Sequence, residues 1–327
     1  MCITVRLLRI LPLVLLISRS PARTTASNSI VKRSYIASSS NFAATSASCN
    51  SKIKMPEKRT APAISSLEDF ERKLPGYLNE NTTLALLLDY DGTLAAIADS
   101  PKNTYMTVAM EKLLNQLAIH PKIFLAMISG RALNDVQSRV GIPGITYAGN
   151  HGLEIESGNG TRHDYPLPAK LQQHYAPMVV ELVENVQKNG AWVEDKTVSL
   201  TYHYRDVPAD LSGALKQQAI RIIESHGYLA NQAHDAIEAK PPVNWHKGEA
   251  ALLILKDKFG PNWADEIKVI FAGDDNTDED AMRSLQGVSK SFRVSADPEI
   301  QTYADFRLTS QNVVEDLLRW IRKTYKD

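Results

Sequence analysis

Short runs of purely apolar residues, separated by longer stretches of mixed polarity, constrain the fold of this chain more than any other feature. The clearest runs lie at 84–88, 123–128 and 269–272. A continuous apolar run of this length is typical of a strand that is buried on both faces, as in a parallel sheet covered by helices. Helical patterns lie between and after the runs, at 108–117, 133–140, 247–259 and 313–323. This alternation predicts an α/β fold built on a Rossmann-like parallel sheet.

A different pattern occupies the middle of the chain, from about 149 to 240. Two helical stretches alternate there with three short strands, and the segments are 169–188, 191–195, 199–204, 211–226 and 236–239. Because such a segment forms a small α+β unit, we expect a cap domain that is inserted into the parallel-sheet core. The predicted organisation is an N-terminal extension at 1–55, a core at 56–148 and 241–327, and the inserted cap at 149–240.

The N-terminal extension is predicted to be disordered or a targeting segment. Residues 1–56 contain no Asp or Glu and carry eight Lys or Arg. The apolar stretch 10–17 resembles the hydrophobic part of a secretory signal, although Pro12 interrupts it, and it is too short to span a bilayer. The scattered arginines and serines equally resemble an organellar transit peptide, and a functional protein that begins at Met55 is the third alternative. We expect a cytoplasmic protein, with the secretory pathway or an organelle as alternatives directed by residues 1–54. Membrane contact is expected only if this segment remains as an uncleaved anchor.

Charge and cysteine content narrow the chemistry and the partners. With the cationic residues of the extension set aside, 29 basic and 37 acidic residues remain. An acidic body without a basic stripe argues against nucleic acid as a partner. The only cysteines, Cys2 and Cys49, both lie in the extension. We therefore expect no disulfide, no thiolate metal site and no cysteine nucleophile in the folded part. The sequence does not predict the oligomeric state.

Two carboxylates stand directly after the first apolar run, in the segment Asp89-Tyr90-Asp91-Gly92-Thr93. The ends of parallel strands are where an open α/β sheet places its ligands. A carboxylate there can attack phosphorus, and a second carboxylate two residues later is near enough to protonate the leaving oxygen. The segment therefore favours phosphoryl transfer by Asp89 and Asp91, and a turn stabilised by aspartate caps is the alternative.

A dianionic phosphate needs positive charge beside these carboxylates, and three further segments can supply it or hold a cation. Ser-Gly-Arg at 129–131 follows the second run, Lys247 begins a helix, and Gly-Asp-Asp at 273–275 follows the third run. Carboxylate oxygens suit Mg²⁺, while Lys247 and the Ser129 hydroxyl can hold phosphate oxygens. Each segment alone also fits a turn or a surface lysine. Their order, each at a strand end or a helix start, favours the catalytic interpretation.

This order of residues resembles the four motifs of the haloacid dehalogenase superfamily, over about 84–318 of the chain. By this resemblance Asp89 is the nucleophile, Asp91 is the general acid/base and Lys247 is the third catalytic residue. The phosphate-binding residues that it implies are Ser129, Gly130 and Lys247. The Mg²⁺ ligands that it implies are Asp89, the backbone carbonyl of Asp91, and Asp274, with Asp275 nearby. The inserted cap lies between the second and third motifs.

Other segments are similar to those of one family within this superfamily, the trehalose-6-phosphate phosphatases. The similarity lies in Gly-Asn-His-Gly-Leu-Glu at 149–154, Glu-Asp-Lys at 194–196, His-Tyr-Arg at 203–205 and the segment 273–282. A sugar phosphate needs several oriented polar partners. The substrate-binding residues that the resemblance implies are Asn150, His151, Glu154, Glu194, Lys196, Arg205 and Glu238. An ordinary solvated sheet face is the alternative for about half of this set.

The resemblance implies an enzyme that hydrolyses trehalose 6-phosphate to trehalose and phosphate, with Mg²⁺ and an aspartyl-phosphate intermediate. Another sugar phosphatase, such as one that acts on sucrose phosphate, is the nearest alternative. A phosphomannomutase would use the same Asp89 but return the phosphoryl group to sugar. An inactive sugar-phosphate sensor is disfavoured, because every catalytic position holds a competent residue. The chain departs from the family at Lys240, where arginine with its planar fork is expected, and at His246, where asparagine is frequent.

Overall fold

The computed structural model describes residues 57–98, 100–233 and 235–325. The predicted extension at 1–55, with Cys2, Cys49 and the targeting alternatives, lies outside these residues. Two sheets dominate the described part, and β1 (Arg59–Thr60) pairs separately with β14 (Gln301–Thr302). Among the described helices, none combines the length and the apolar character that are needed to cross a lipid bilayer.

The larger sheet contains the three strands that the apolar runs predict. Its nine strands lie in the order β2-β15-β13-β12-β3-β4-β5-β6-β7. Neighbours are parallel from β2 to β5, whereas β6 and β7 pair antiparallel. In the same order, the strands are Ala63–Ile64, Phe306–Leu308, Lys290–Val294, Lys268–Gly273, Leu84–Leu88, Ile123–Ile128, Thr146–Gly149, Glu154–Glu156 and Arg162–Asp164. The predicted α/β fold with a parallel core is confirmed.

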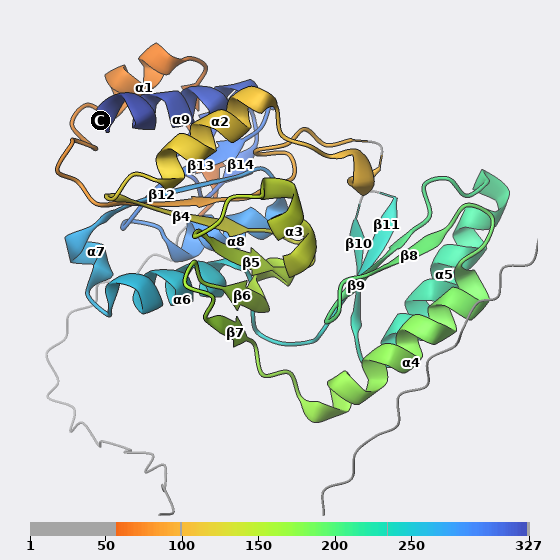
Figure 1. Cartoon of the computed structure of the whole chain (residues 1–327). Coiled ribbons are helices and arrows are strands. Elements are labelled where there is room, and N and C mark those ends of the chain that lie inside the picture. Colours follow the sequence, from red (N-terminus) through yellow and green to blue (C-terminus); the bar gives the residue numbers. More distant parts are fainter. Residues whose placement is uncertain (1–56, 99, 234, 326–327) are drawn as a thin grey trace, which may run out of the picture. The chain divides into compact units, whose positions relative to one another are not determined.

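Helices cover both faces of this sheet, because successive residues of a strand point to opposite sides. In β3, Leu84, Leu86 and Leu88 belong to the hydrophobic cluster formed with α1, α2, α3 and α9. Ala85 and Leu87 belong to a second cluster, formed with α6, α7 and α8. Figure 1 shows α1, α2 and α9 on one side of the strands and α6 on the other. These helices are Leu67–Lys73 (α1), Val108–Ala118 (α2), Leu133–Val140 (α3), Lys247–Phe259 (α6), Trp263–Glu266 (α7), Asn276–Ser284 (α8) and Asn312–Thr324 (α9).

The middle of the chain forms a smaller sheet with its own core. Its four antiparallel strands lie in the order β10-β11-β9-β8, with bounds Leu229–Ala233, Ala236–Lys240, Leu200–His203 and Trp192–Asp195. Leu200, Tyr202 and Ile237 pack in a third hydrophobic cluster with α4 (Ala169–Val186) and α5 (Ala209–Ser225). The alternate residues of these strands point to the opposite face, which α4 and α5 leave uncovered (Figure 1).

The segment 149–164 pairs within the larger sheet, although we assigned it to the cap from the sequence. Gly149 lies opposite Glu154 in the β5–β6 pair, and Glu154 lies opposite Asp164 in the β6–β7 pair. The division of the chain into core and cap stays a prediction, and this pairing favours a cap that starts after β7. The sequence patterns also missed β10, because its side chains are mostly exposed and do not form an apolar run.

Candidate active site

The carboxyl ends of β3, β4 and β12 bring together the residues that the sequence motifs indicate. Asp89 directly follows β3 and is 4% exposed, and its amide donates a hydrogen bond to the Ala272 carbonyl of β12 at 3.0 Å. Ser129 follows β4 and is fully buried. Asp274 follows β12, so these side chains meet at one edge of the sheet, where the parallel strands end.

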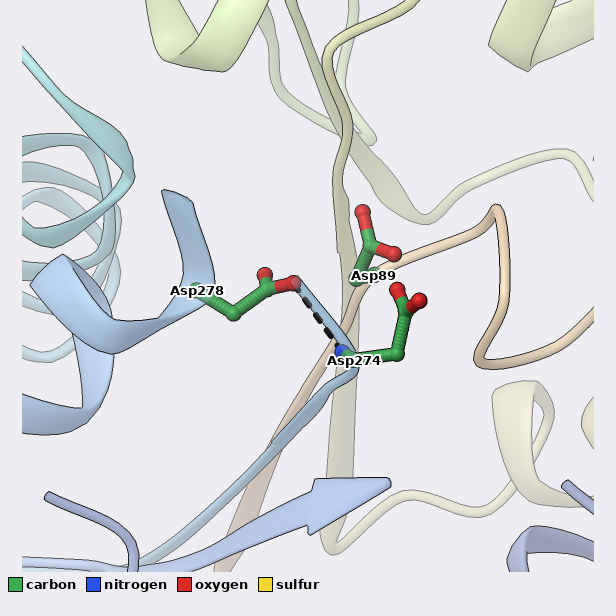
Figure 2. Close-up of side chains that lie close together, drawn as sticks. All are labelled: Asp89, Asp274 and Asp278. Carbon is green, nitrogen blue, oxygen red and sulfur yellow. Dashed lines mark hydrogen bonds between the residues drawn. The ribbon is translucent and has the colours of Figure 1, made fainter. Parts of the chain in front are cut away.

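Three carboxylates gather at this edge. Oxygens of Asp89, Asp274 and Asp278 all lie within 4.8 Å of one another, and Figure 2 shows the Asp274 carboxylate directed toward Asp89. Burial raises the pKa of Asp89 to about 7, against the charge of Lys247. Burial and the neighbouring Asp278 raise the pKa of Asp274 to about 7. Burial therefore disfavours the charged form of both carboxylates, and the neighbouring aspartates add to this effect.

The residues present fit a divalent cation between Asp89 and Asp274. A Cβ on Gly92 would lie 2.1 Å from Asp274 Oδ2, so the carboxylate rests against bare backbone that only glycine provides. Carboxylate oxygens are the ligands that Mg²⁺ prefers. Asp278 has less to offer a cation, because its Oδ1 accepts from Lys247 and its Oδ2 accepts from the amides of Asp274 and Asp275.

Asp275 caps helix α8 in this structure. Its Oδ1 accepts hydrogen bonds from the Thr277 and Asp278 amides, which completes a capping box at the helix start. Burial acts to raise the pKa of Asp275, but the charge of Lys247 and these hydrogen bonds lower it below its usual range. The sequence indicated Asp275 as lying near the metal and did not indicate Asp278. The signal for Asp278 was its position as the third residue of a helix that begins with a capping aspartate.

Lys247 places a buried positive charge beside the nucleophile candidate. Its Nζ lies 2.6 Å from Asp89 Oδ1 and 2.8 Å from Asp278 Oδ1. These carboxylates raise the pKa of Lys247 well above its usual value, even though burial opposes the charge. His246 stands where the family frequently has asparagine, and it acts as the N-cap of α6. Its Nδ1 accepts hydrogen bonds from the amides of Gly248 and Glu249.

Asp91 is held by an arginine that the sequence noted only as part of a motif. Arg131 Nε donates to Asp91 Oδ2 at 2.7 Å, and Nη2 donates to Asp91 Oδ1 at 2.6 Å. Nη1 of the same guanidinium binds Asp135 at 2.7 Å. Such a two-pronged pair fixes the plane of the carboxylate. The Asp91 side chain is 39% exposed, so it still faces the adjacent cleft.

A cleft of about 470 Å³ separates this cluster from the open face of the smaller sheet. Most of the expected substrate-binding residues line it beside the acidic cluster, namely His151, Glu194, Lys196, Arg205 and Glu238. His203, from the segment 203–205 that the sequence indicated, lines it as well, and so does Trp192, which the sequence did not indicate. Lys196 Nζ crosses to the Gly130 carbonyl at 3.1 Å, so the smaller sheet contacts the backbone of the second motif.

Glu238 joins the two walls of the cleft. Its Oε1 lies 3.0 Å from His151 Nε2, and its Oε2 lies 2.9 Å from Lys240 Nζ. Burial lowers the pKa of His151 against the attraction of Glu238, so a neutral imidazole donates Nε2–H to the carboxylate. Lys240, which stands where the family pattern has arginine, therefore binds Glu238 by a single point contact.

Asn150 and Glu154 do not line the cleft. The Asn150 amide group is buried and donates to Glu154 Oε2 at 2.7 Å and to the Lys196 carbonyl at 2.9 Å, while its oxygen accepts from Ser199 at 2.6 Å. Asn150 and His151 both adopt left-handed backbone angles, with φ of 50° and 58°. This turn at the end of β5 ties the larger sheet to the smaller one, so Asn150 and its partner Glu154 support the cleft from behind, while His151 lines it.

Comparison with known proteins places the chain in a family. The sequence model of the trehalose-phosphatase family matches residues 87–312. Probable trehalose-phosphate phosphatase C of Arabidopsis thaliana is 31% identical over 75% of this chain and 80% of its own length. The trehalose-phosphate phosphatase of Mycobacterium tuberculosis is 33% identical over 69% of this chain, which spans 58% of that relative. The C-terminal domain of the trehalose-6-phosphate phosphatase of C. albicans has the same fold, with a TM-score of 0.62 and 21% identity over 79% of this chain and 97% of that one. The chain therefore belongs to the trehalose-phosphatase family.

Proposed function

We propose that this protein is a Mg²⁺-dependent phosphatase that hydrolyses trehalose 6-phosphate through an aspartyl-phosphate on Asp89. The observation that carries the proposal is the position of Asp89, buried between Lys247 and Asp274 at the bottom of a cleft that the smaller sheet overhangs. The names of the relatives support the substrate, and the polar residues on the facing wall support a sugar phosphate as its class.

The reaction proceeds in two displacements at phosphorus. An oxygen of Asp89 forms a bond to phosphorus while the bond between phosphorus and the sugar oxygen breaks. The leaving sugar oxygen takes a proton from protonated Asp91. Water then attacks the same phosphorus, Asp91 accepts the proton, and the bond to Asp89 breaks to release phosphate. Lys247 neutralises part of the phosphate charge, and the Ser129 hydroxyl and the Gly130 amide are the proposed phosphate ligands.

Mg²⁺ would be held by Asp89, the backbone carbonyl of Asp91 and Asp274, with Asp275 as the cap that fixes the loop between β12 and α8. When bound, it would neutralise charge on the phosphate and on the carboxylates. The buried cluster of Asp89, Asp274 and Asp278 supports this proposal, because like charges at such short distances need a cation to relieve their repulsion.

Magnesium should raise the melting temperature of the protein. At one hundred times its dissociation constant a ligand adds about 2.7 kcal/mol to stability, which for a domain of this size is roughly 5 to 10 °C. Asp274→Asn should abolish the increase. Asp275→Asn is the matched control, since asparagine also caps helices and should keep it. A full increase in Asp274→Asn, measured by scanning calorimetry, would remove Asp274 from the metal site.

The facing wall is proposed to recognise the sugar through Glu194, Lys196, Arg205 and Glu238, which line the cleft. Glu238→Gln should lower kcat/KM for trehalose 6-phosphate by roughly 10- to 150-fold, because a hydrogen bond to a charged group contributes ~1.5–3 kcal/mol. It should spare a small aryl phosphate that does not reach this wall. Glu184→Gln, on the exposed side of α4, is the matched control. Parallel losses on both substrates would show that Glu238 supports the fold through His151 instead.

A phosphate-release assay over a panel of sugar phosphates tests the proposed function. Trehalose 6-phosphate should give the highest kcat/KM, with trehalose and phosphate as products. A clear preference for sucrose phosphate would assign the protein to the alternative phosphatase. Conversion of a hexose phosphate without release of phosphate, dependent on a bisphosphate activator, would assign it to the mutases.

We further propose that the protein acts in the cytoplasm. We also propose that its catalytic unit begins at Met55, because every proposed site residue lies after that position. A chain that starts at Met55 should keep the full kcat/KM of the complete protein. A soluble but inactive chain would show that residues 1–54 contribute to the enzyme. Import of a fluorescent fusion into an organelle or the secretory pathway would favour the targeting alternatives.

A further inference from the structure

A contact between the loop after β3 and the smaller sheet lies beside the cleft. The Lys102 ammonium lies 5.0 Å from the centre of the Trp192 ring. Lys102 belongs to the short 3₁₀ turn Pro101–Asn103, which follows the catalytic loop after β3, and Trp192 begins β8 of the smaller sheet. A cation over an indole face is attracted by the ring. In the described part of the chain, Lys102 forms no ion pair with a carboxylate. The Trp192 ring is therefore the partner that the structure shows for its ammonium group.

Trp192 is fixed on the smaller sheet by its neighbours there. Its ring stacks on His203 of β9, with ring centres 4.1 Å apart and planes 11° from parallel. His203 Nε2 in turn lies 2.8 Å from Glu194 Oε2, one of the proposed sugar ligands. The indole therefore moves with the sugar-binding face of the sheet.

Lys102 is linked on its other side to the proposed general acid. The carbonyl of Pro101, the preceding residue, accepts a hydrogen bond from Arg131 Nη2 at 3.0 Å. The same Nη2 donates to Asp91 Oδ1 at 2.6 Å. The proline ring limits rotation of this backbone, and the turn is closed by a hydrogen bond from the Asn103 amide to the Ser100 carbonyl at 2.9 Å. A shift of the turn therefore changes the acceptors that hold the guanidinium on Asp91.

We propose that Lys102 and Trp192 are positioning residues that couple docking of the smaller sheet to the orientation of Asp91, through Pro101 and Arg131. The proposal rests on the proposed function, in which Asp91 transfers a proton to the leaving sugar oxygen. With Lys102 on Trp192, the Pro101 carbonyl retains Arg131 and Asp91 is aligned toward the cleft. Without that contact, the turn and the arginine have more than one arrangement, and fewer molecules have Asp91 in place to protonate the leaving group.

The coupling predicts a specific kinetic pattern for Lys102→Met, which removes the charge and keeps the length of the side chain. The kcat for trehalose 6-phosphate should fall about 2- to 30-fold, the range that corresponds to one cation–π contact. The kcat for an aryl phosphate should stay unchanged, since its leaving group needs little protonation. Lys102→Arg keeps the cation and should restore the wild-type kcat. Lys268→Met removes a similar contact, over Tyr77 at 5.8 Å and remote from the cleft, and should change neither rate.

The decisive comparison places Lys102→Met in the Asp91→Asn background, with single-turnover rates measured for trehalose 6-phosphate. Because Lys102 acts through Asp91, the second substitution should add no further loss there, and Lys102→Met should likewise add nothing to Trp192→Leu. A further loss of the same size in the Asp91→Asn background would overturn the proposal, as would an effect confined to KM. If the wild-type protein prefers another sugar phosphate, the proposal of trehalose 6-phosphate as the substrate is wrong. The coupling is then tested with the same variants and the preferred sugar phosphate.

Discussion

Asp89→Asn should lose essentially all turnover, by at least ~10³-fold in kcat, while the protein stays folded. The expectation follows from the proposed covalent role, because an amide oxygen does not replace a carboxylate as the nucleophile. The fold should survive, since Lys247 keeps its ion pair with Asp278 at 2.8 Å and the buried cluster loses one of its crowded charges. The measurement is kcat with trehalose 6-phosphate, together with a circular dichroism melting curve.

A chemical readout separates the nucleophile from a residue that only binds metal. Acid-quenched wild-type protein should retain a radiolabelled phosphoryl group from the substrate, and Asp89→Asn should retain none. Asp257→Asn, on an exposed position of α6, is the matched control and should behave as the wild type. Equal labelling of the Asp89→Asn protein would place the covalent bond on another residue.

The parallel core was predictable because its strands carry a signal that needs no tertiary context. The run at 84–88 is apolar on both faces, and the structure buries every residue of β3. A carboxylate directly after such a strand has to lie at the edge where ligands bind. The parallel core and the position of Asp89 at its edge therefore followed from the local sequence.

The support for the cleft was not predictable in the same way. Asn150 was expected to contact the sugar, but its left-handed turn buries it against Lys196 and Ser199. The hydrophobic periodicity of a sequence does not predict such a turn. Strands β6 and β7 carry charged side chains, so the pattern did not separate them from a solvated cap.

Pairings between distant charged residues were equally hidden. Arg131 and Asp91 are 40 positions apart, and which acceptor a buried guanidinium takes depends on how β3 and β4 align in space. The sequence placed both residues at strand ends. It therefore indicated the site, but it did not indicate the two hydrogen bonds between Arg131 and Asp91. Lys102 lies in the turn after β3 of the larger sheet and Trp192 lies in β8 of the smaller sheet, so only the packing of these two parts brings them together.

Asp91→Asn should lower kcat for trehalose 6-phosphate by roughly 10²- to 10⁴-fold, the usual contribution of a general acid/base. An asparagine fills the same space and keeps an oxygen for Arg131, so the loss reports proton transfer more than disruption of the fold. A sugar alkoxide is a poor leaving group and needs the proton, whereas an aryl oxide leaves readily without it. The loss should therefore be much smaller with an aryl phosphate.

The contrast between the two aspartates is the test of their separate roles. Both substrates must form the covalent bond, so Asp89→Asn should abolish turnover of each, while only Asp91→Asn should discriminate between leaving groups. The measurement is the ratio of kcat values for the sugar phosphate and the aryl phosphate in each variant. An unchanged ratio in Asp91→Asn would mean that Asp91 acts on the attacking step or on the metal, because only a proton donor to the leaving oxygen makes the rate depend on what leaves.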